Sequence, residues 1–595
     1  MHTRIGRTIA GVLALGMVLG VAGTASAEER GGPFENIKVS PVAATWQYSK
    51  DGGKTFSDQP QPAPRAGVAP TGHEPKYPYA WKGAFEIADP SKVAGLWVRI
   101  FEEHEYAAAP RASICTGDLI AASGGYWKDL GFTPTLLDAV VKVNDKEVPI
   151  AHGPLLYFWL PLLTELKQGK NTIEMSGHVY TYWGGAAYAG SQAPVKKLDV
   201  KMIMAEAQPT EIYNGPILGD CGDAYFTLAC RTQIQADLTV EATPVEPAGA
   251  AVTAVSKNKI WHRVKIEIPK GTRKVTYTLT AKVGAHETKR GPFTATLPAG
   301  DSFRFVAFGN VGGHSRGVDI WAANSKLVLK AAPALLVNSG NTMEQSPWTF
   351  NWEKYYTGPA GDLFAAVPQL VTPCNRDFTG IFNELHYTPA PDGYAHNWSK
   401  VIGPVRFIGV DGNEDWKVGN GNYVWLEKEL SSAKEKFIVV LDGYPAYSSG
   451  INSKKAFPAH LQTRNVVLPL LGKHKASLML CSWDPDYERI EPTPDKGVTQ
   501  IVTGAIGAAS WHKWDGRIGQ NPFGPGPNAN ARAAWGKVVR PDGGEWVGYV
   551  STRHFCVFDV TPSAMTMKVL ACGGNAAADI KDLKVLDEKV FKPRQ

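Results

Sequence analysis

The stretch between Phe303 and Gly313 constrains the fold more than any other part of the chain. It reads Phe-Arg-Phe-Val-Ala-Phe-Gly-Asn-Val-Gly-Gly, so bulky apolar residues run directly into a glycine-rich turn. This pattern is typical of a buried strand that delivers a polar side chain, here Asn310, to its C-terminal edge. Open α/β sheets bind their ligands at that edge. The sequence therefore predicts a polar site that includes Asn310.

Four further segments repeat the pattern of an apolar run that ends in small or polar residues. They are Ala334–Asn341, Pro368–Asp377, Lys436–Asp442 and Ser477–Asp484. Apolar residues at helical spacing lie between two of these runs, from residue 425 to residue 433. Alternating strands and helices favour an α/β domain. We expect the five strand ends to converge on one edge.

In their order and spacing the five segments resemble the calcineurin-type metallophosphoesterase fold, and within it the purple acid phosphatases. The phrases Trp425–Leu430, Tyr444–Gly450, Tyr487–Arg489 and Ile501–Gly504 share in the resemblance. Together the motifs span residues 302–510, and they are specific as a set rather than singly. The resemblance implies a four-layer α/β sandwich with two metal ions at the strand ends.

The family's metal-ligand positions are nearly all changed in this chain. They are occupied here by Asn310, Asn341, Glu344, Asn375, Arg376, Gly443, Trp483 and Pro485, which we call the vacated positions. The family has aspartates at the first two and histidines at the last three, and only Asn375 keeps the family's residue. A di-metal centre needs anionic and imidazole ligands to hold two cations about 3.5–4 Å apart. The resemblance therefore implies an enzyme fold that has lost its chemistry.

Charged residues remain around the vacated positions. Arg376 brings a positive charge, and Asp377, Asp442 and Asp484 lie on the neighbouring loops. One interpretation pairs Arg376 with Asp377 or Asp484, so that an ion pair replaces the metals. A second lets Arg376 and loop amides bind an anion such as phosphate without hydrolysing it. We favour the first, and we expect His314 to be a solvated loop residue rather than a ligand or base.

The N-terminus predicts export. Arg4 and Arg7 precede an apolar run, and Ala25-Ser26-Ala27 has the pattern of a signal-peptidase site. We expect a signal peptide over residues 1–27, cut after Ala27, and a secreted or periplasmic protein that does not span a membrane. Loss of the two arginines lowers the net charge from +6 to +4, which does not favour a nucleic-acid partner.

Two cysteines lie on loops that would face the metals in the family. For an exported chain we hypothesise that Cys374 and Cys481 form a disulfide across the vacated positions. The alternative is a pair of buried thiols.

Two β-rich segments precede the central domain. Residues 28–205 contain a Val-Lys-Val-Asn-Asp-Lys-Glu-Val strand followed by Leu-x-x-Gly-x-Asn-Thr-Ile, which resembles a galactose-binding-like jelly roll. Residues 206–298 alternate in Lys274–Val283 and resemble the fibronectin-type-III-like domain that precedes the catalytic domain of purple acid phosphatases. We predict two all-β sandwich domains, then the metallophosphoesterase-like α/β domain over 299–515. A loop and C-terminal strands over 516–595 would complete it.

These observations favour a secreted, catalytically degenerate protein that acts in binding or as a structural component of the envelope or extracellular space. We expect no cofactor. A polysaccharide or envelope component bound through the N-terminal β-sandwich would suit this function, since Trp127, Tyr180, Tyr182 and Trp183 offer aromatic faces to sugar rings, although core packing explains them as well. The alternative is an active metal-dependent acid phosphatase with a di-metal centre of iron, zinc or manganese held by non-standard ligands.

Overall fold

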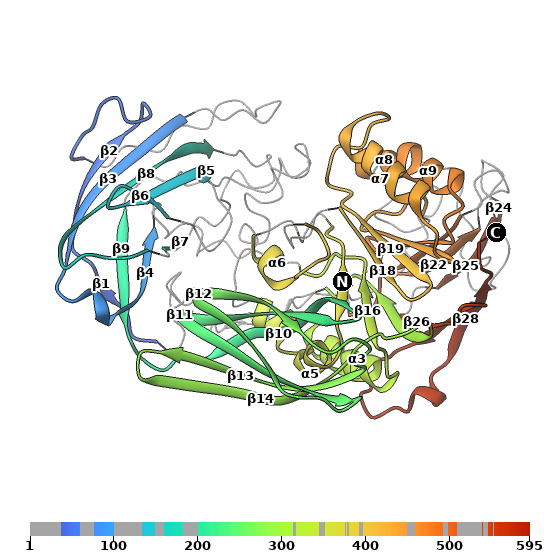
Figure 1. The fold of residues 1–595 in the computed structure, drawn as a ribbon. Helices are drawn as coiled ribbons and strands as arrows, with labels where there is room; N and C mark the ends of the chain where they lie inside the picture. The colour runs from blue at the N-terminus through green and yellow to red at the C-terminus, as the bar shows by residue number, and fades with distance from the viewer. Residues whose placement is uncertain are drawn as a thin grey trace, which may run out of the picture.

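Strands dominate the part of the chain that the computed structural model describes. That part comprises residues 37–59, 77–99, 134–148, 160–162, 164–181, 200–312, 317–343, 352–374, 377, 380–391, 397–448, 458–491, 498–507, 538–539, 545–550 and 553–594. Two β-structures lead into a larger domain that contains all the α-helices of the described part (Figure 1). No helix in the described ranges is long and apolar enough to cross a membrane.

The first domain consists of two sheets around one core. One sheet has the order β2 (Ala44–Ser49), β3 (Tyr77–Ile87), β8 (Gly169–Thr181), β5 (Pro134–Val143) and β6 (Lys146–Glu147). The other has the order β1 (Ser40–Pro41), β9 (Lys201–Glu206), β4 (Val93–Arg99) and β7 (Leu160–Pro161). Trp81 and Ile173 from the first sheet pack with Leu96, Val98 and Met202 from the second. The last strand of this sheet along the chain is β9, which ends at Glu206.

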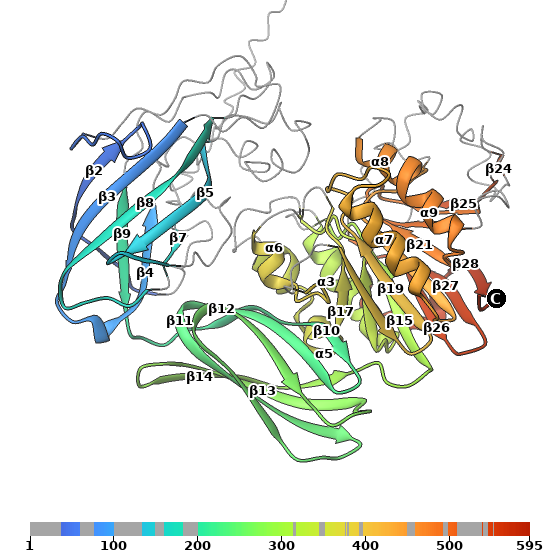
Figure 2. The same ribbon diagram turned by 45° about the horizontal axis from the view of Figure 1, so that its top comes forward.

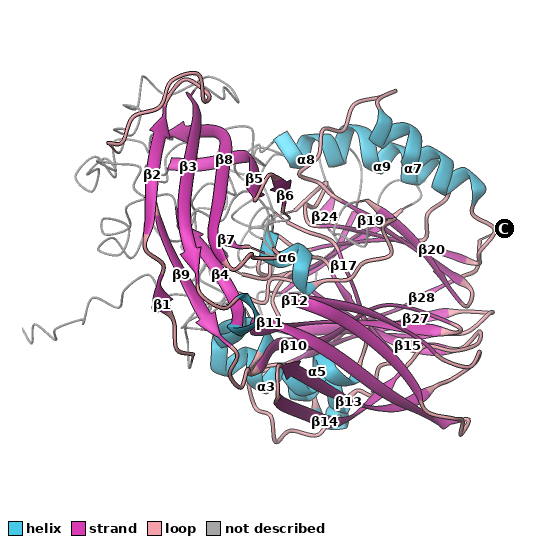
Figure 3. Cartoon of the chain, turned by 60° about the vertical axis from the view of Figure 1, so that its left-hand side comes forward, coloured by secondary structure: helices cyan, strands magenta, loops and turns pink. Residues whose placement is uncertain are grey.

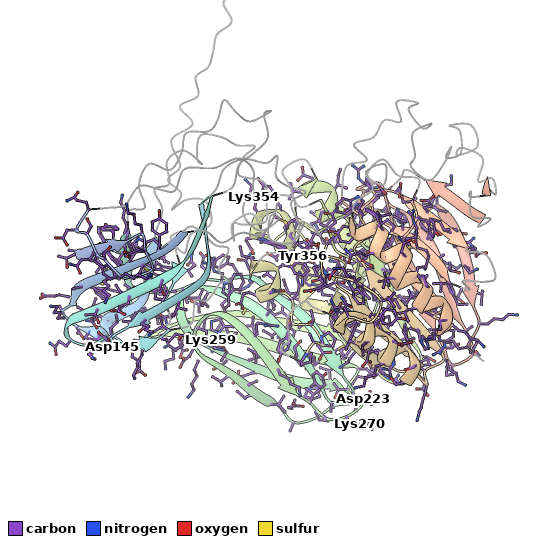
Figure 4. The ribbon with its side chains drawn as sticks, turned by 90° about the horizontal axis from the view of Figure 1, so that it is seen from above. Asp145, Asp223, Lys259, Lys270, Lys354 and Tyr356 are labelled. Carbon is purple, nitrogen blue, oxygen red and sulfur yellow. The ribbon has the colours of Figure 1, made fainter. Side chains whose placement is uncertain are left out.

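The second domain is an antiparallel sheet of five strands. They are β10 (Ile212–Gly222), β11 (Tyr225–Glu246), β12 (Val252–Glu267), β13 (Lys274–Val283) and β14 (His286–Thr296). The alternation seen in the sequence of β13 is real, since Val275, Tyr277 and Leu279 are all buried. Figure 4 places Lys259 at the end nearer the first domain, and Asp223 and Lys270 at the end nearer the larger one. The long strands of the second domain therefore run from the side of the first domain to the side of the central domain.

The first strand of the central domain belongs to a six-stranded mixed sheet. Its order is β17 (Gln369–Val371), β16 (Leu335–Asn338), β15 (Phe303–Phe308), β26 (His554–Val560), β27 (Met565–Ala571) and β28 (Val585–Phe591). The three strands β15, β16 and β17 are parallel, and β26 runs antiparallel to β15. Parallel strands end at the same edge of a sheet, so the loops after Phe308, Asn338 and Val371 meet there.

An eight-stranded mixed sheet faces the first one. Its order is β18 (Trp398–Ile402), β19 (Val405–Val410), β20 (Phe437–Asp442), β21 (Leu478–Cys481), β23 (Thr499–Thr503), β22 (Tyr487–Glu491), β25 (Glu545–Val550) and β24 (Val538–Val539). The strands β19, β20, β21 and β23 are parallel. All five apolar runs predicted from the sequence are strands, and the C-terminal strands add to both sheets.

Aromatic rings join the two sheets, and helices cover their outer faces. Phe305 of β15 stacks on Phe558 of β26 at 4.4 Å and meets Phe407 of β19 edge-on at 5.4 Å, measured between ring centroids. The helices α7 (Gly421–Ser432), α8 (Pro458–Gln462) and α9 (Leu468–Lys473) gather on the eight-stranded side (Figures 2 and 3). On the six-stranded side, Trp321 of α3 (Val318–Lys330) contacts Phe308 of β15. It also contacts Phe364 of α5 (Gly361–Ala366). The short helix α6 (Gly380–Leu385) contacts the second domain.

A buried polar junction fastens the second domain to the central one. Lys400 of β18 contacts Asp220 of β10 at 2.8 Å, and the Lys400 ammonium also lies 2.6 Å from the Tyr225 hydroxyl of β11. That hydroxyl donates to the second Asp220 oxygen at 2.7 Å. Elsewhere in the junction, the Tyr277 hydroxyl donates to the Ala365 carbonyl at 2.8 Å. These directional contacts fix the orientation of the two domains.

Candidate functional site

Three loops meet at the carboxyl ends of the strands, and each places one vacated position in left-handed backbone. Asn310 follows β15, Asn341 follows β16 and Trp483 follows β21, with φ angles of 50°, 57° and 62°. Asparagine adopts this conformation more readily than most residues, whereas for a bulky residue it is an outlier. The packing around Trp483 must therefore hold it in place, at a cost of about 1–3 kcal/mol.

Side-chain amides tie these three loops together. The Asn341 Nδ2 donates to the Asn310 Oδ1, and the Asn310 Nδ2 donates to the Trp483 carbonyl at 3.0 Å. The backbone N–H of Asn310 also donates to the Gly340 carbonyl at 3.0 Å. Each amide has a donor and an acceptor, so two of them can bond directly where two carboxylates would repel each other. The contact is neutral and needs no cation.

Asp377 fastens the loop after β17 to the loop after β16. Its carboxylate accepts from the backbone N–H groups of Thr342 at 2.7 Å and Cys374 at 3.1 Å, and also from the Asn341 N–H and the Thr342 hydroxyl. Burial raises the pKa of Asp377 to about 6, although these hydrogen bonds favour the ionised form. The residue acts as a crosslink between loops.

Gly443 leaves no space for a larger side chain. A Cβ atom on Gly443 would lie 2.8 Å from the Cys374 Cβ and 2.9 Å from the Pro373 carbonyl oxygen. Real Cβ atoms do not approach other atoms so closely. A histidine at this position, as the family resemblance would require, therefore does not fit the loop after β17 as it stands.

Three rings fill the space next to Gly443, and we call them the ring cluster: Tyr444, His460 and Trp483. The Tyr444 and Trp483 rings lie 4.9 Å apart, and His460 meets them edge-on at 5.5 Å and 5.4 Å. Trp483 is only 7% exposed and packs with Tyr444 and Cys374. Burial lowers the pKa of His460, which keeps its ring neutral, and His460 Nδ1 lies 2.7 Å from the Pro445 carbonyl oxygen.

Comparison with known proteins places this architecture. A purple acid phosphatase from yellow lupin (Lupinus luteus) seeds has a similar structure over 88% of this chain and 95% of its own, with a TM-score of 0.52 at 15% identity. The chain has the purple acid phosphatase fold. The structure of PhoD is also similar, over 64% of this chain and 90% of its own, with a TM-score of 0.45 at 12% identity.

Sequence similarity is much more limited than structural similarity. The tartrate-resistant acid phosphatase type 5 of Sus scrofa is 30% identical over 81 residues, which are 14% of this chain. The match spans about a fifth (22%) of that relative's length. No family model matches the chain. The purple acid phosphatase fold is therefore established here by structure, with an activity that has to be judged from the site itself.

The described residues at the vacated positions do not fit a di-metal centre. Two amides are bonded to each other, a glycine abuts Cys374, and the Trp483 ring is packed in the ring cluster. Pro485, beside them in the turn after β21, offers no ligand atom in its side chain. Within the described ranges no group of three or more His, Cys, Asp or Glu side chains could hold a metal ion. A purple acid phosphatase centre needs such ligands.

Asp442 and Asp484, which lie on the loops near the vacated positions, both accept hydrogen bonds from described residues. Asp442 accepts from the Tyr444 N–H and the Thr463 hydroxyl, both at 2.9 Å, and burial raises its pKa to about 7. Asp484 accepts from the Ser448 hydroxyl at 2.6 Å. Arg376 lies outside the described residues, so its pairing with Asp377 or Asp484 and its binding of an anion both stay predictions.

The predicted disulfide is wrong for this structure. Cys374 and Cys481 are both free thiols, as are the other described cysteines. The Cys374 side chain packs with Tyr444 and Trp483, whereas Cys481 belongs to the core beneath α7 and α9. The two side chains therefore pack in different clusters, and their sulfur atoms are not bonded to each other.

Several predicted residues lie outside the described ranges. They are the vacated positions Glu344, Asn375 and Arg376, together with His314, the signal peptide and the aromatic residues Trp127, Tyr182 and Trp183. The sequence reasoning also missed two residues of the site. Asp411 lies directly after β19, where an apolar run ends in Asp-Gly-Asn, so the rule used for the other strands would have found it. His460 follows no strand, and nothing in its local sequence marks it.

Proposed function

We propose that this chain is a catalytically inactive protein with the purple acid phosphatase fold, and that it acts by binding or as a structural component. The observation that carries the proposal is the hydrogen bond between the side-chain amides of Asn341 and Asn310. In a di-metal hydrolase, carboxylates at these positions would be held together by cations. Here the two neutral groups hold each other, which supports a protein that needs no metal to keep its loops in place.

The proposal includes the finer architecture and the site of action. A four-layer α/β domain would follow a galactose-binding-like domain and a fibronectin-type-III-like domain. The galactose-binding-like domain would bind a polysaccharide or an envelope component after export of the chain. Its two-sheet core supports a sandwich of this kind, because such modules present loops and sheet faces to ligands.

Metal content and hydrolysis test the inactive state together. The mature chain, purified without chelators or nickel resin, would be assayed by metal mass spectrometry and with p-nitrophenyl phosphate from pH 4 to pH 8, with iron, zinc or manganese added. We expect far less than one metal ion per chain and no turnover above buffer. Two metals per chain, with turnover that an Asp377→Asn variant abolishes, would overturn the proposal and support the active phosphatase.

The binding role has a separate test. The full mature chain would be sedimented with insoluble polysaccharides and with isolated cell envelopes, and soluble sugars would be added as competitors. We expect retention on one of these materials, and competition would identify a polysaccharide rather than another envelope component. Failure of every material to retain the chain would contradict the binding role and leave the inactive-fold proposal standing.

A further inference from the structure

Two buried carboxylates lie at the same edge of the eight-stranded sheet, where the charge of Asp442 helps to raise the pKa of Asp411. Asp411 follows β19, and Asp442 ends β20, where it is in register with Val410. Both side chains are inaccessible to solvent. Among the described residues, no lysine or arginine forms a hydrogen bond or ion pair with either carboxylate, so no such cation compensates their charge. Buried carboxylates without a cation favour the protonated state.

These two carboxylates hold Tyr444 of the ring cluster at both ends. The Asp442 Oδ1 accepts from the Tyr444 backbone N–H at 2.9 Å. The Asp411 Oδ1 accepts from the backbone N–H and the side-chain Nδ2 of Asn413 at 2.9 Å and 2.8 Å. The Asn413 Oδ1 in turn accepts from the Tyr444 hydroxyl at 2.7 Å. The backbone and the hydroxyl of Tyr444 are therefore both anchored by the carboxylate pair.

One carboxylate oxygen of the pair lacks a hydrogen-bond partner. The Asp411 Oδ2 is buried and has no hydrogen-bond partner. An ionised carboxylate in this position is penalised because nothing solvates that oxygen. A proton on Oδ2 removes the charge and leaves both Asn413 hydrogen bonds to Oδ1 intact. Burial raises the pKa of Asp411 to about 7, with Glu414 and Asp442 adding to the shift, and burial likewise raises that of Asp442 to about 7.

Acidic, thiol, imidazole and guanidinium groups surround the pair. Within the described part of the chain, the titratable groups that face the pair or Tyr444 include Glu414 on the loop after β19, Cys481 on β21, Cys374 and Asp377 after β17, and His460 on α8. Burial lowers the pKa of His460, which favours its neutral form. Arg464 lies in the π-helical segment Thr463–Val467, next to the Thr463 that donates to Asp442, and its guanidinium donates to the Ala446 carbonyl.

We propose that Asp411 and Asp442 form a proton-operated latch that holds the ring cluster closed in mildly acidic surroundings and loosens it when both carboxylates ionise. Two ionised groups in a low-dielectric interior repel each other and require water. The loop that covers them is tightly packed, since a Cβ atom on Gly412 would lie 2.6 Å from the Asp442 Oδ1 and 2.5 Å from the Tyr444 ring. Water can therefore enter only if this loop and Tyr444 move. The latch acts on the ring cluster, which packs beside the vacated positions. It does not depend on what the chain binds.

Hydrogen exchange measured by mass spectrometry tests the latch directly. The full mature chain would be compared at pH 5.5 and pH 8.5, with rates corrected for intrinsic exchange. Peptides that cover residues 411–416 and 442–448 report on the latch, and a peptide from β26 serves as reference. We expect protection of the latch peptides to fall at least about tenfold at pH 8.5, the factor that one unit of pKa represents, while β26 keeps its protection.

A matched pair of variants assigns the effect. Asp411→Asn keeps a neutral side chain at every pH, so most of the pH effect should disappear. Asp415→Asn removes an exposed carboxylate of the same loop, paired with Lys417 at 3.0 Å, and should behave as the unmodified chain does. Equal protection at both pH values in the unmodified chain, or an unchanged pH effect in Asp411→Asn, would overturn the latch. If Asp411→Asn fails to fold, Asp442→Asn replaces it, and the unmodified chain alone still decides the first point.

Discussion

The Asn341 side chain donates a hydrogen bond to the Asn310 side chain, and both residues have left-handed backbone with φ near 50°. The two loops therefore turn tightly at the strand ends, and the asparagine side chains that join them carry no charge. The shape is held by amide contacts, by Asp377 and by the ring cluster. Each of these three elements can be tested separately from any question of activity.

Asn341→Asp should destabilise the chain and should not be rescued by metal. The carboxylate would lose the donor that reaches the Asn310 Oδ1 and would place two acceptors together, because the Asn310 Nδ2 is already bonded to the Trp483 carbonyl. We expect a loss of about 1–3 kcal/mol in the free energy of unfolding, measured with urea. Asn575→Asp, at an exposed turn, is the control. Stabilisation by added zinc or manganese would show that the loops still bind metal.

Gly443→Ala should be more harmful than an ordinary glycine replacement. The new Cβ would clash with Cys374 and with the Pro373 carbonyl, so the loop after β17 would have to shift. Overpacking of this kind costs about 1–3 kcal/mol. Gly421→Ala at the start of α7 is the matched control, since nothing lies within 4 Å of its Cβ position. Equal unfolding midpoints for the two variants would mean that the space beside Cys374 is larger than the structure shows.

The buried carboxylates should make stability depend on pH in a direction that variants can isolate. The pKa of Asp442 is raised by burial from 3.8 to about 7, so the folded state binds a proton that the unfolded state releases. Its contribution to stability is therefore fully present below pH 3.8 and is lost as the pH rises towards 7. Asp377 and Asp411 act in the same direction.

Buried histidines oppose this effect, so the total change with pH is not diagnostic. Burial lowers the pKa of His262 and His386 to about 3, and they favour unfolding as the pH falls below 6.5. We therefore expect the difference in unfolding free energy between the unmodified chain and Asp442→Asn to shift in favour of the unmodified chain from pH 8 to pH 5. Urea unfolding at both pH values measures it. A difference that stays constant would show that Asp442 does not change its protonation.

Lys400→Met should weaken the junction between the second and central domains. The variant leaves the buried Asp220 carboxylate without its cation, and breaking such a pair costs about 3 kcal/mol. Limited proteolysis should also become faster at the domain boundary. Lys568→Met removes an exposed partner of Glu588 and should cost less than about 1 kcal/mol. Similar losses in both variants would exclude a special role for the junction.

The sequence predicted the strands better than the packing between them. Phe303–Phe308 and Leu478–Cys481 are recognisable because their apolar runs end in polar residues. The ring cluster was not predictable, because His460 approaches Tyr444 and Trp483 from a helix whose position depends on the whole sheet. The disulfide prediction failed for a related reason. The positions of Cys374 and Cys481 after strands predict that both lie near one edge of a sheet. The direction of each side chain decides which hydrophobic cluster it joins, and this direction is not evident from the sequence.

The position of β26 has a consequence for the order in which the protein can be made. Arg304 of β15 pairs with Asp559 of β26 at 2.8 Å across 255 residues of sequence. The first strand of the central domain can pair early with β16, but its other edge lacks a neighbour until the ribosome has synthesised most of the chain. Such long-range pairing slows folding and leaves a strand edge exposed in the meantime. A ribosome that stalls before β26 would therefore release a product unable to complete its six-stranded sheet.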